Sequence, residues 1–247
     1  METFDKRDVN LKTTLLLHGW PQYIEPDHPI SILFNELGYN VVAPKLFEHK
    51  YTITNIKSII KRELKNKSPN VIVGVSQGGM LAQIIALTYP NSKLILVATG
   101  PYLKPKFNLF FKFLFYSRLT DLIYLFLKIM PRSIIFPFYK LTNFINGSNF
   151  KDYESVMNQN IKTIKLIKYH IYRQVFNFVL KTNNVKILNK IINNTLILGG
   201  KKDMLMPIEL SNIMNQEIKN STLTIFDEPH YKVITNTNSL DKIKKFV

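Results

Sequence analysis

A serine between two glycines is the most chemically suggestive feature of this sequence. Residues 74–78 read Gly-Val-Ser-Gln-Gly, with Ser76 at the centre and Gly74 and Gly78 at the ends. On a sharp turn between a strand and a helix, such a serine exposes its hydroxyl above a sheet edge, and the crowded turn requires small neighbours. The amino terminus of the following helix favours developing negative charge. The pattern therefore predicts Ser76 as a nucleophile.

A serine hydroxyl is a weak nucleophile at neutral pH and needs a base, usually a histidine. Of the five histidines in the chain, His230 directly follows the last predicted strand, in the string Asp-Glu-Pro-His. Loops after parallel strands open at the carboxyl edge of the sheet, where Ser76 is also expected. We therefore predict His230 as the base, with His49, in an irregular loop, as the second choice.

The base requires a carboxylate that holds its tautomer and stabilises the imidazolium. Asp203 follows the strand predicted at Thr195–Leu198 through Gly-Gly-Lys-Lys, again at the carboxyl edge. On its own, an aspartate here is more typical of a turn or cap before a helix. Because Ser76, Asp203 and His230 occur in the chain order that a strand–serine–helix architecture uses, we predict that they form a catalytic triad.

A His-Gly-Trp-Pro string after the first predicted strand offers an oxyanion loop. A tetrahedral intermediate needs hydrogen-bond donors directed at its oxyanion. We predict the backbone N–H groups of Trp20 and Gln77 as this pair, since Pro21 has no N–H. The Trp20 side chain can equally form a pocket wall or core contact. The adjacent Gly19 suggests that His18 has a role other than that of the base.

Apolar strands and helical patterns alternate along the parts of the chain that must position these residues. Six strands are predicted, at Thr13–Leu17, Asn40–Ala43, Asn70–Val73, Lys93–Ala98, Thr195–Leu198 and Leu223–Phe226. Helices are predicted at Pro29–Leu37, Thr54–Lys67, Gly79–Tyr89, Pro207–Lys219 and from Ser239 onward. This alternation is typical of an α/β fold with parallel strands joined by right-handed crossovers.

The alternation breaks at residue 100 and resumes near residue 191. The stretch between has no clear buried strand and is rich in Phe, Tyr, Leu and Lys. We therefore expect residues 1–99 and 191–247 to form one core domain, with residues 100–190 as a helical insertion. A chain of 247 residues is long enough to bury a substantial core in this arrangement.

Composition restricts the chemistry and the location of the protein. The chain has no Cys, which excludes disulfides, thiol catalysis and a thiolate zinc site, and no motif calls for a metal or another cofactor. The amino terminus lacks the apolar core of a secretory signal. No run approaches the about 18 uncharged apolar residues of a spanning helix. We expect a cytoplasmic protein that is at most peripheral to a membrane.

Taken together, these motifs resemble the α/β-hydrolase superfamily, in the branch with a His-Gly oxyanion loop and a helical cap. The resemblance covers residues 13–99 and 191–247 and rests on residues 18–21, 74–79, 200–203, 207 and 229–230. It implies that Ser76 attacks an acyl carbonyl, with His230 as base and Asp203 as its orienting acid. Epoxide hydrolases have a similar oxyanion loop, but they and haloalkane dehalogenases carry aspartate where Ser76 stands, so we reject both activities.

The resemblance leaves the subfamily and the reaction open. Residues 44–49 lack the glycine-rich string that many members carry after the second strand. The predicted reaction is cleavage of a carboxylic ester or thioester, with a hydrophobic acyl group, through an acyl-enzyme. The alternatives are acyl transfer, C–C bond hydrolysis or a lyase reaction by the same triad, and a non-catalytic binding protein that keeps the fold.

The predicted insertion is both basic and aromatic. Of the net charge of +16, residues 100–190 contribute most, with 15 Lys and Arg against 3 Asp and Glu, and residues 107–144 hold twelve Phe and Tyr. One predicted helical face combines Phe107, Phe110, Phe111, Leu114 and Phe115. These side chains either seal the insertion onto the core or build an acyl pocket.

The excess of basic residues predicts an acidic partner, unless it reflects codon bias in a Lys-rich chain. An acyl-carrier protein is one such partner, because carrier-bound acyl chains are substrates within the resembling superfamily. An anionic membrane surface is another, because basic faces with Phe and Leu lie well at lipid interfaces. Nucleic acid ranks last, since the sequence contains no recognised binding module.

Overall fold

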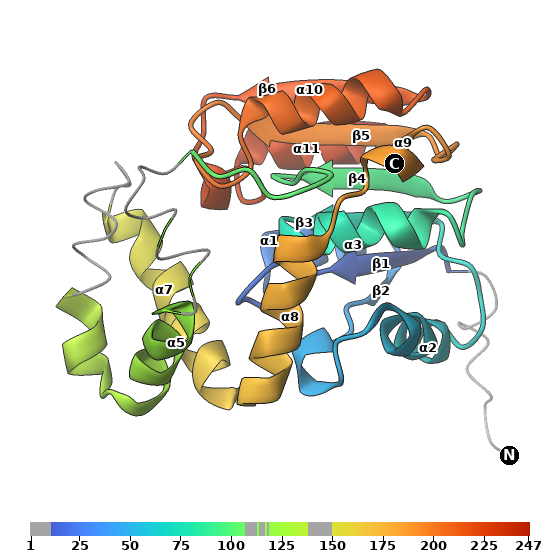
Figure 1. The fold of residues 1–247 in the computed structure, drawn as a ribbon. Coiled ribbons are helices and arrows are strands. Elements are labelled where there is room, and N and C mark those ends of the chain that lie inside the picture. Colours follow the sequence, from blue (N-terminus) through green and yellow to red (C-terminus); the bar gives the residue numbers. More distant parts are fainter. Residues whose placement is uncertain (1–10, 107–112, 114–116, 118, 138–149) are drawn as a thin grey trace, which may run out of the picture.

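The computed structural model describes residues 11–106, 113, 117, 119–137 and 150–247, and within them six strands form one sheet (Figure 1). The strands are β1 Thr13–Leu17, β2 Asn40–Val42, β3 Val71–Val75, β4 Lys93–Val97, β5 Thr195–Gly200 and β6 Ser221–Phe226. Their order is β2-β1-β3-β4-β5-β6, and every neighbouring pair is parallel. The predicted α/β fold with a six-stranded parallel sheet is confirmed.

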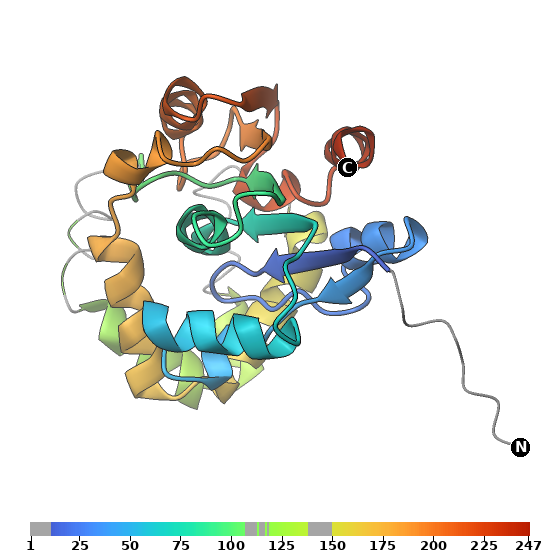
Figure 2. The same ribbon diagram turned by 90° about the vertical axis from the view of Figure 1, so that its right-hand side faces the viewer.

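Helices cover both faces of the sheet, because side chains that alternate along each strand are apolar on both sides. Leu16 of β1 faces α1 (Pro29–Glu36) and α11 (Thr237–Phe246), in one buried cluster. Leu15 and Leu17 belong to a second cluster on the other face. That face carries α2 Ile53–Glu63, α3 Gln77–Ala86 and α10 Ile208–Glu217 (Figure 2).

The strand and helix around Ser76 begin and end at different residues from those expected. Strand β3 continues to Val75, because Gly74 and Val75 still pair with β4 in parallel register. Helix α3 begins at Gln77, because Ser76 itself is the residue before its first turn. The strand and helix are therefore separated by one residue, and Ser76 is that residue.

The described part of the chain between β4 and β5 includes several helices, and we call four of them the intervening helices. They are α5 Leu119–Ile129, α7 Phe150–Leu166, α8 Tyr169–Lys181 and α9 Val185–Leu188. Figure 1 shows α5, α7 and α8 beyond the carboxyl ends of the strands. Their buried side chains, including Leu127, Ile164 and Val175, join the apolar cluster on the α3 face of the sheet. The predicted aromatic face at Phe107–Phe115 involves residues outside the described part.

Polar and aromatic contacts fix α5 against α7 and α8. Arg173 Nη1 of α8 donates hydrogen bonds to Asp121 Oδ1 at 2.9 Å and Oδ2 at 3.0 Å. The ring of Tyr124 stacks on that of Tyr172 with centroids 4.1 Å apart, and its hydroxyl donates to the Ile167 carbonyl at 2.6 Å. These contacts hold α5 in one orientation relative to α8. No helix in the described ranges is long and apolar enough to cross a membrane.

Candidate active site

Ser76 occupies a strained turn that the surrounding backbone holds on both sides. Its φ of 53° and ψ of −121° are unfavourable for a residue with a Cβ atom. Its N–H donates to the carbonyl of Val97 in β4 at 2.9 Å. Its own carbonyl accepts from the N–H of Gly79 at 2.9 Å and from the hydroxyl of Thr99 at 2.6 Å. These bonds fix the turn that exposes the serine hydroxyl beyond β3.

The neighbouring glycines are required because other chain segments pass close to the turn. A Cβ atom at Gly78 would overlap the carbonyl oxygen of Leu17 at the end of β1, and one at Gly74 would lie 2.5 Å from Ala82 Cβ. At Gly19, a Cβ would lie 3.0 Å from Ser76 Cβ and 3.6 Å from its Oγ. The loop after β1 therefore runs directly beside the serine hydroxyl.

The structure brings together Ser76, His230 and Asp203 from three separate loops. His230 lies after β6, at the first position of the short helix η3 (His230–Lys232), and its Nε2 is 2.9 Å from Ser76 Oγ. Its Nδ1 is 2.6 Å from Asp203 Oδ2. Because a carboxylate only accepts hydrogen bonds, we assign the ring proton to Nδ1. Nε2 is then free to accept the proton of the serine hydroxyl.

Asp203 is both the turn residue and the partner of the histidine. Its Oδ1 accepts hydrogen bonds from the N–H groups of Leu205 at 2.9 Å and Met206 at 2.8 Å, which closes the turn before α10. Its Oδ2 remains for His230. The side chain is fully buried, and these contacts hold its two oxygens in fixed directions. The sequence suggested two roles for Asp203, a turn residue and the partner of the histidine. Each role uses a different oxygen of the same carboxylate.

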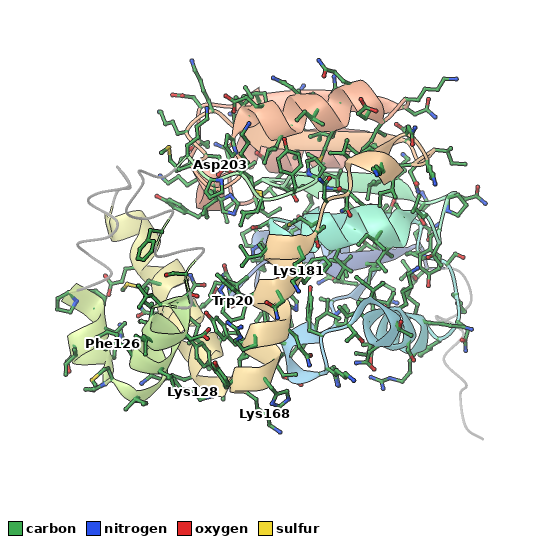
Figure 3. The ribbon with its side chains drawn as sticks, viewed as in Figure 1. Trp20, Phe126, Lys128, Lys168, Lys181 and Asp203 are labelled. Atoms are coloured by element: carbon green, nitrogen blue, oxygen red, sulfur yellow. The ribbon has the colours of Figure 1, made fainter. Side chains whose placement is uncertain are left out.

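Two backbone N–H groups beside Ser76 are available as oxyanion donors. Gln77 is the first residue of α3, where the N–H has no partner within the helix. Trp20 follows Gly19 on the loop beside the serine, and neither N–H has a hydrogen-bond partner among the described residues. The Trp20 ring packs against Phe47 and against Tyr172 of α8, and Figure 3 shows Trp20 beside α8.

The other histidines of interest stand apart from this site. His18 is buried, and its Nε2 accepts from the Leu46 N–H at 3.1 Å. Burial lowers the pKa of His18 to about 4, against a smaller opposing effect of its hydrogen bond to Gly19. His49 follows the short helix η2 (Leu46–Glu48) and has no hydrogen bond to Ser76. The described residues contain no group of three or more acidic or histidine side chains that could hold a metal.

A cavity of about 450 Å³ opens onto Ser76 and His230. One wall is the loop after β1, including Trp20, and another comes from the intervening helices. The latter contribute mostly apolar and aromatic side chains, namely Ile123, Tyr124, Leu127, Ile164, Tyr172 and Phe176. Burial is the main cause that raises the pKa of Tyr172 to about 12, so its hydroxyl stays protonated. The cavity suits an apolar group attached to the atom that Ser76 would attack.

Several residues around the site were not identified from sequence. Thr99 packs its side chain on Gly79 and binds the Ser76 carbonyl. The hydroxyl of buried Tyr51 accepts a hydrogen bond from the side chain of Gln77. Asn160 of α7 is a buried amide at the cavity wall. None of the three lies in a recognisable motif, and the aromatic richness of residues 107–144 was the only signal that the intervening helices contribute to the site.

One curated protein with a related sequence is a poly(3-hydroxyalkanoate) depolymerase from Ectopseudomonas oleovorans. The two chains are 30% identical over 182 residues, which is 70% of this chain and 58% of the relative. The chain thus matches little more than half of the length of that relative. No protein-family model matches the chain.

Many solved structures share the fold at low sequence identity. An enol-lactonase from Burkholderia xenovorans has a TM-score of 0.71 at 12% identity, covering 98% of this chain and 93% of its own. A bromoperoxidase from Bacillus anthracis has a TM-score of 0.72 at 19% identity, with coverages of 96% and 92%. An esterase from Exiguobacterium antarcticum has a TM-score of 0.65 at 20% identity, with coverages of 95% and 91%. The chain therefore has the α/β-hydrolase fold.

Proposed function

We propose that the protein is a serine hydrolase that cleaves a carboxylic ester or thioester through an acyl-enzyme. The observation that carries the proposal is the continuous chain of contacts from Ser76 Oγ through the ring of His230 to Asp203, at 2.9 and 2.6 Å. Both distances are within hydrogen-bond reach, as acylation by a serine requires. The α/β-hydrolase fold and the two backbone N–H groups beside the serine support the same reaction.

In the first half of the reaction, His230 Nε2 accepts the proton of Ser76 as Oγ attacks the acyl carbonyl. The N–H groups of Trp20 and Gln77 donate to the oxyanion of the tetrahedral intermediate. Asp203 keeps the imidazolium in place through Nδ1. The intermediate collapses when the bond to the leaving oxygen or sulfur breaks, and His230 delivers its proton to that atom. The products of this half are an alcohol or thiol and the acylated Ser76.

In the second half, His230 removes a proton from a water molecule that attacks the acyl carbonyl. The second tetrahedral intermediate uses the same two backbone donors. Its collapse breaks the bond to Ser76 Oγ, which regains a proton from His230. The acid is released, and the triad returns to its starting protonation state.

The cavity supports a substrate whose acyl group is apolar. We infer that the intervening helices act as a cap, because Leu127, Ile164 and Phe176 line the cavity that opens onto Ser76 and His230. The relative from Ectopseudomonas oleovorans is described as a depolymerase of a poly(3-hydroxyalkanoate), which is a polyester. Ester cleavage with an apolar acyl chain is consistent with that description and with the shape of the site.

The test is a series of p-nitrophenyl esters of increasing acyl length. We expect wild type to hydrolyse them, with kcat/KM rising with chain length until the cavity is filled. Ser76→Ala should lower kcat/KM by at least about a thousandfold. Ser58→Ala, at an exposed serine of α2, is the control and should behave as wild type.

Two results would overturn the proposal or its site. If wild type cleaves no ester or thioester, the hydrolase assignment fails. If Ser76→Ala keeps wild-type activity, the reaction occurs elsewhere. Formation of a new ester when an alcohol is added, with no release of free acid, would replace hydrolysis by acyl transfer.

A further inference from the structure

Helix α5 is apolar on two opposite faces. Its inner face, with Ile123, Tyr124 and Leu127, lines the cavity. Its outer face carries Leu122, Leu125 and Ile129, which are 61%, 42% and 71% exposed. A helix at the surface of a globular protein normally carries polar residues on its outer face. The outer face of α5 therefore has a composition that solvent contact does not explain.

Further exposed apolar side chains lie on segments that follow α5 in the chain or are hydrogen-bonded to it. Hydrogen bonds join the neighbouring segments to α5: Lys165 Nζ donates to the Met130 carbonyl at 3.0 Å, and the hydroxyl of Tyr169 donates to Asp121 Oδ2 at 3.0 Å. We define the α5 patch as six side chains, each at least 42% exposed: Leu122, Leu125, Ile129, Ile134, Leu166 and Tyr169. Clustered apolar exposure of this kind marks an interaction site.

Basic side chains surround the α5 patch. Lys162, Lys165 and Lys168 are exposed on the neighbouring segments, whereas Arg132 pairs with Glu154 of α7 at 3.9 Å. Figure 3 shows Lys128 and Lys168 along the lower edge of the intervening helices. The acidic side chain on α5 is neutralised by the ion pair between Asp121 and Arg173, which is only partly exposed. The surface therefore combines positive charge with apolar side chains.

We propose that the α5 patch binds an anionic lipid surface. Lysines are suited to this, because their long stems lie along apolar surface while their charges reach lipid headgroups. A folded protein partner would need a complementary surface to bury six side chains from several helical segments. At a lipid interface, each apolar side chain can insert without such a complementary surface. The contacts that fix α5 hold the apolar face outward. This proposal is independent of whether Ser76 is catalytic.

Vesicle sedimentation tests the proposal directly. Wild type should bind vesicles of phosphatidylcholine with a substantial share of phosphatidylglycerol, and bind vesicles of phosphatidylcholine alone at least about tenfold more weakly. Because the attraction is screened within a Debye length, binding should fall as NaCl rises from low to high concentration. Hydrolysis of a water-soluble p-nitrophenyl ester gives a separate readout of the folded site.

Two multiple variants assign the binding to the patch. The triple variant Leu122→Ser, Leu125→Ser and Ile129→Ser removes apolar side chains that do not line the cavity, and it should weaken vesicle binding by at least about tenfold. Lys162→Gln combined with Lys168→Gln should weaken it by about tenfold at low salt. Both should keep the wild-type thermal midpoint and soluble ester activity.

Matched controls remove similar groups from the core domain. The triple variant Ile32→Ser, Leu87→Ser and Ile192→Ser changes side chains that are 44%, 39% and 63% exposed there. The double variant Lys61→Gln and Lys244→Gln changes exposed lysines of α2 and α11. Vesicle binding by these controls should match that of wild type.

Each other outcome contradicts the proposal. Wild type that binds no anionic vesicle refutes it. An equal loss of vesicle binding in the core-domain control variants shows that binding is not located at the α5 patch. A large drop in thermal midpoint for the α5 triple variant means that part of the chain itself covers this face. Salt-sensitive binding to an acyl-carrier protein, without vesicle binding, replaces the lipid surface by an acidic protein.

Discussion

The chemistry of the site depends on how single side chains divide their hydrogen bonds. Asp203 uses one oxygen to close the turn before α10 and the other to hold His230. A side chain that is fixed by its own turn presents the second oxygen in one direction. His230 is then oriented with Nε2 toward Ser76, whose strained backbone exposes Oγ. Local structure and proposed catalysis thus use the same atoms.

His18 provides a prediction about pH and stability. Burial lowers its pKa from 6.5 to about 4 in the folded state, so the unfolded chain binds more protons between these values. The free energy of unfolding should therefore be highest above about pH 6.5 and should decrease as pH falls toward 4, by about 2 to 3 kcal/mol from this group. Urea denaturation at several pH values measures this decrease. His28, whose pKa burial also lowers to about 4, adds a second contribution of the same sign.

The variant His18→Gln isolates the contribution of His18. Glutamine can still accept from the Leu46 N–H but does not titrate, so the loss of stability between pH 7 and 4.5 should be smaller than in wild type. His170→Gln, at an exposed histidine of α8, is the control and should keep the wild-type dependence. Parallel curves for wild type and His18→Gln would contradict the prediction.

At the scale of elements, the close packing of the end of β1 against the start of α3 determines the shape of the site. Gly78 lies against the carbonyl end of β1, so a side chain there must push the two apart. Gly78→Ala should cost about 3 kcal/mol or more and should abolish ester hydrolysis by displacing Ser76. Chemical denaturation and ester assays measure both effects.

Gly38 is the matched control for this substitution. It has a φ of +74°, but a Cβ atom there would meet nothing within 4 Å. Gly38→Ala should therefore cost only about 1 kcal/mol of backbone strain and leave hydrolysis unchanged. If Gly78→Ala were as mild as this control, close packing between β1 and α3 would not be what holds the serine turn.

Strands and helices could be predicted from the sequence where their apolar residues follow a regular pattern. Continuous apolar runs such as Thr13–Leu17 gave the strands, and turn signals such as Gly38 gave helix ends. The start of α3 was missed because Gly78 and Gly79 disfavour a helix in isolation, and only packing against β1 and Thr99 makes glycine necessary there. Local propensity contains no information on such contacts.

At the scale of the whole molecule, the sheet brings together groups from distant parts of the chain. The order Ser76, Asp203, His230 was recognisable because parallel strands place their following loops at one edge. The cavity wall could not be recognised from the sequence, because Tyr124, Asn160 and Tyr172 come together only through packing among α5, α7 and α8. Aromatic content alone did not indicate which side chains face the serine and which face outward.

The intervening helices extend one apolar cluster of the core beyond the sheet. Their inner side completes the cavity above Ser76, and the outer side of α5 carries three of the six side chains of the α5 patch. Substrate selection and surface binding are thus proposed for opposite faces of the same helix. The two proposals can fail independently, because changes on one face leave the side chains of the other in place.

The central claim is that Ser76 is a nucleophile activated by His230, and covalent labelling tests it most directly. A fluorophosphonate probe followed by peptide mass spectrometry should modify one peptide of the wild-type protein, the one that contains Ser76. Labelling should disappear in Ser76→Ala, slow by at least about a hundredfold in His230→Ala, and remain unchanged in Ser58→Ala. A wild-type protein that stays unlabelled, or that carries the label on a residue other than Ser76, would contradict the account.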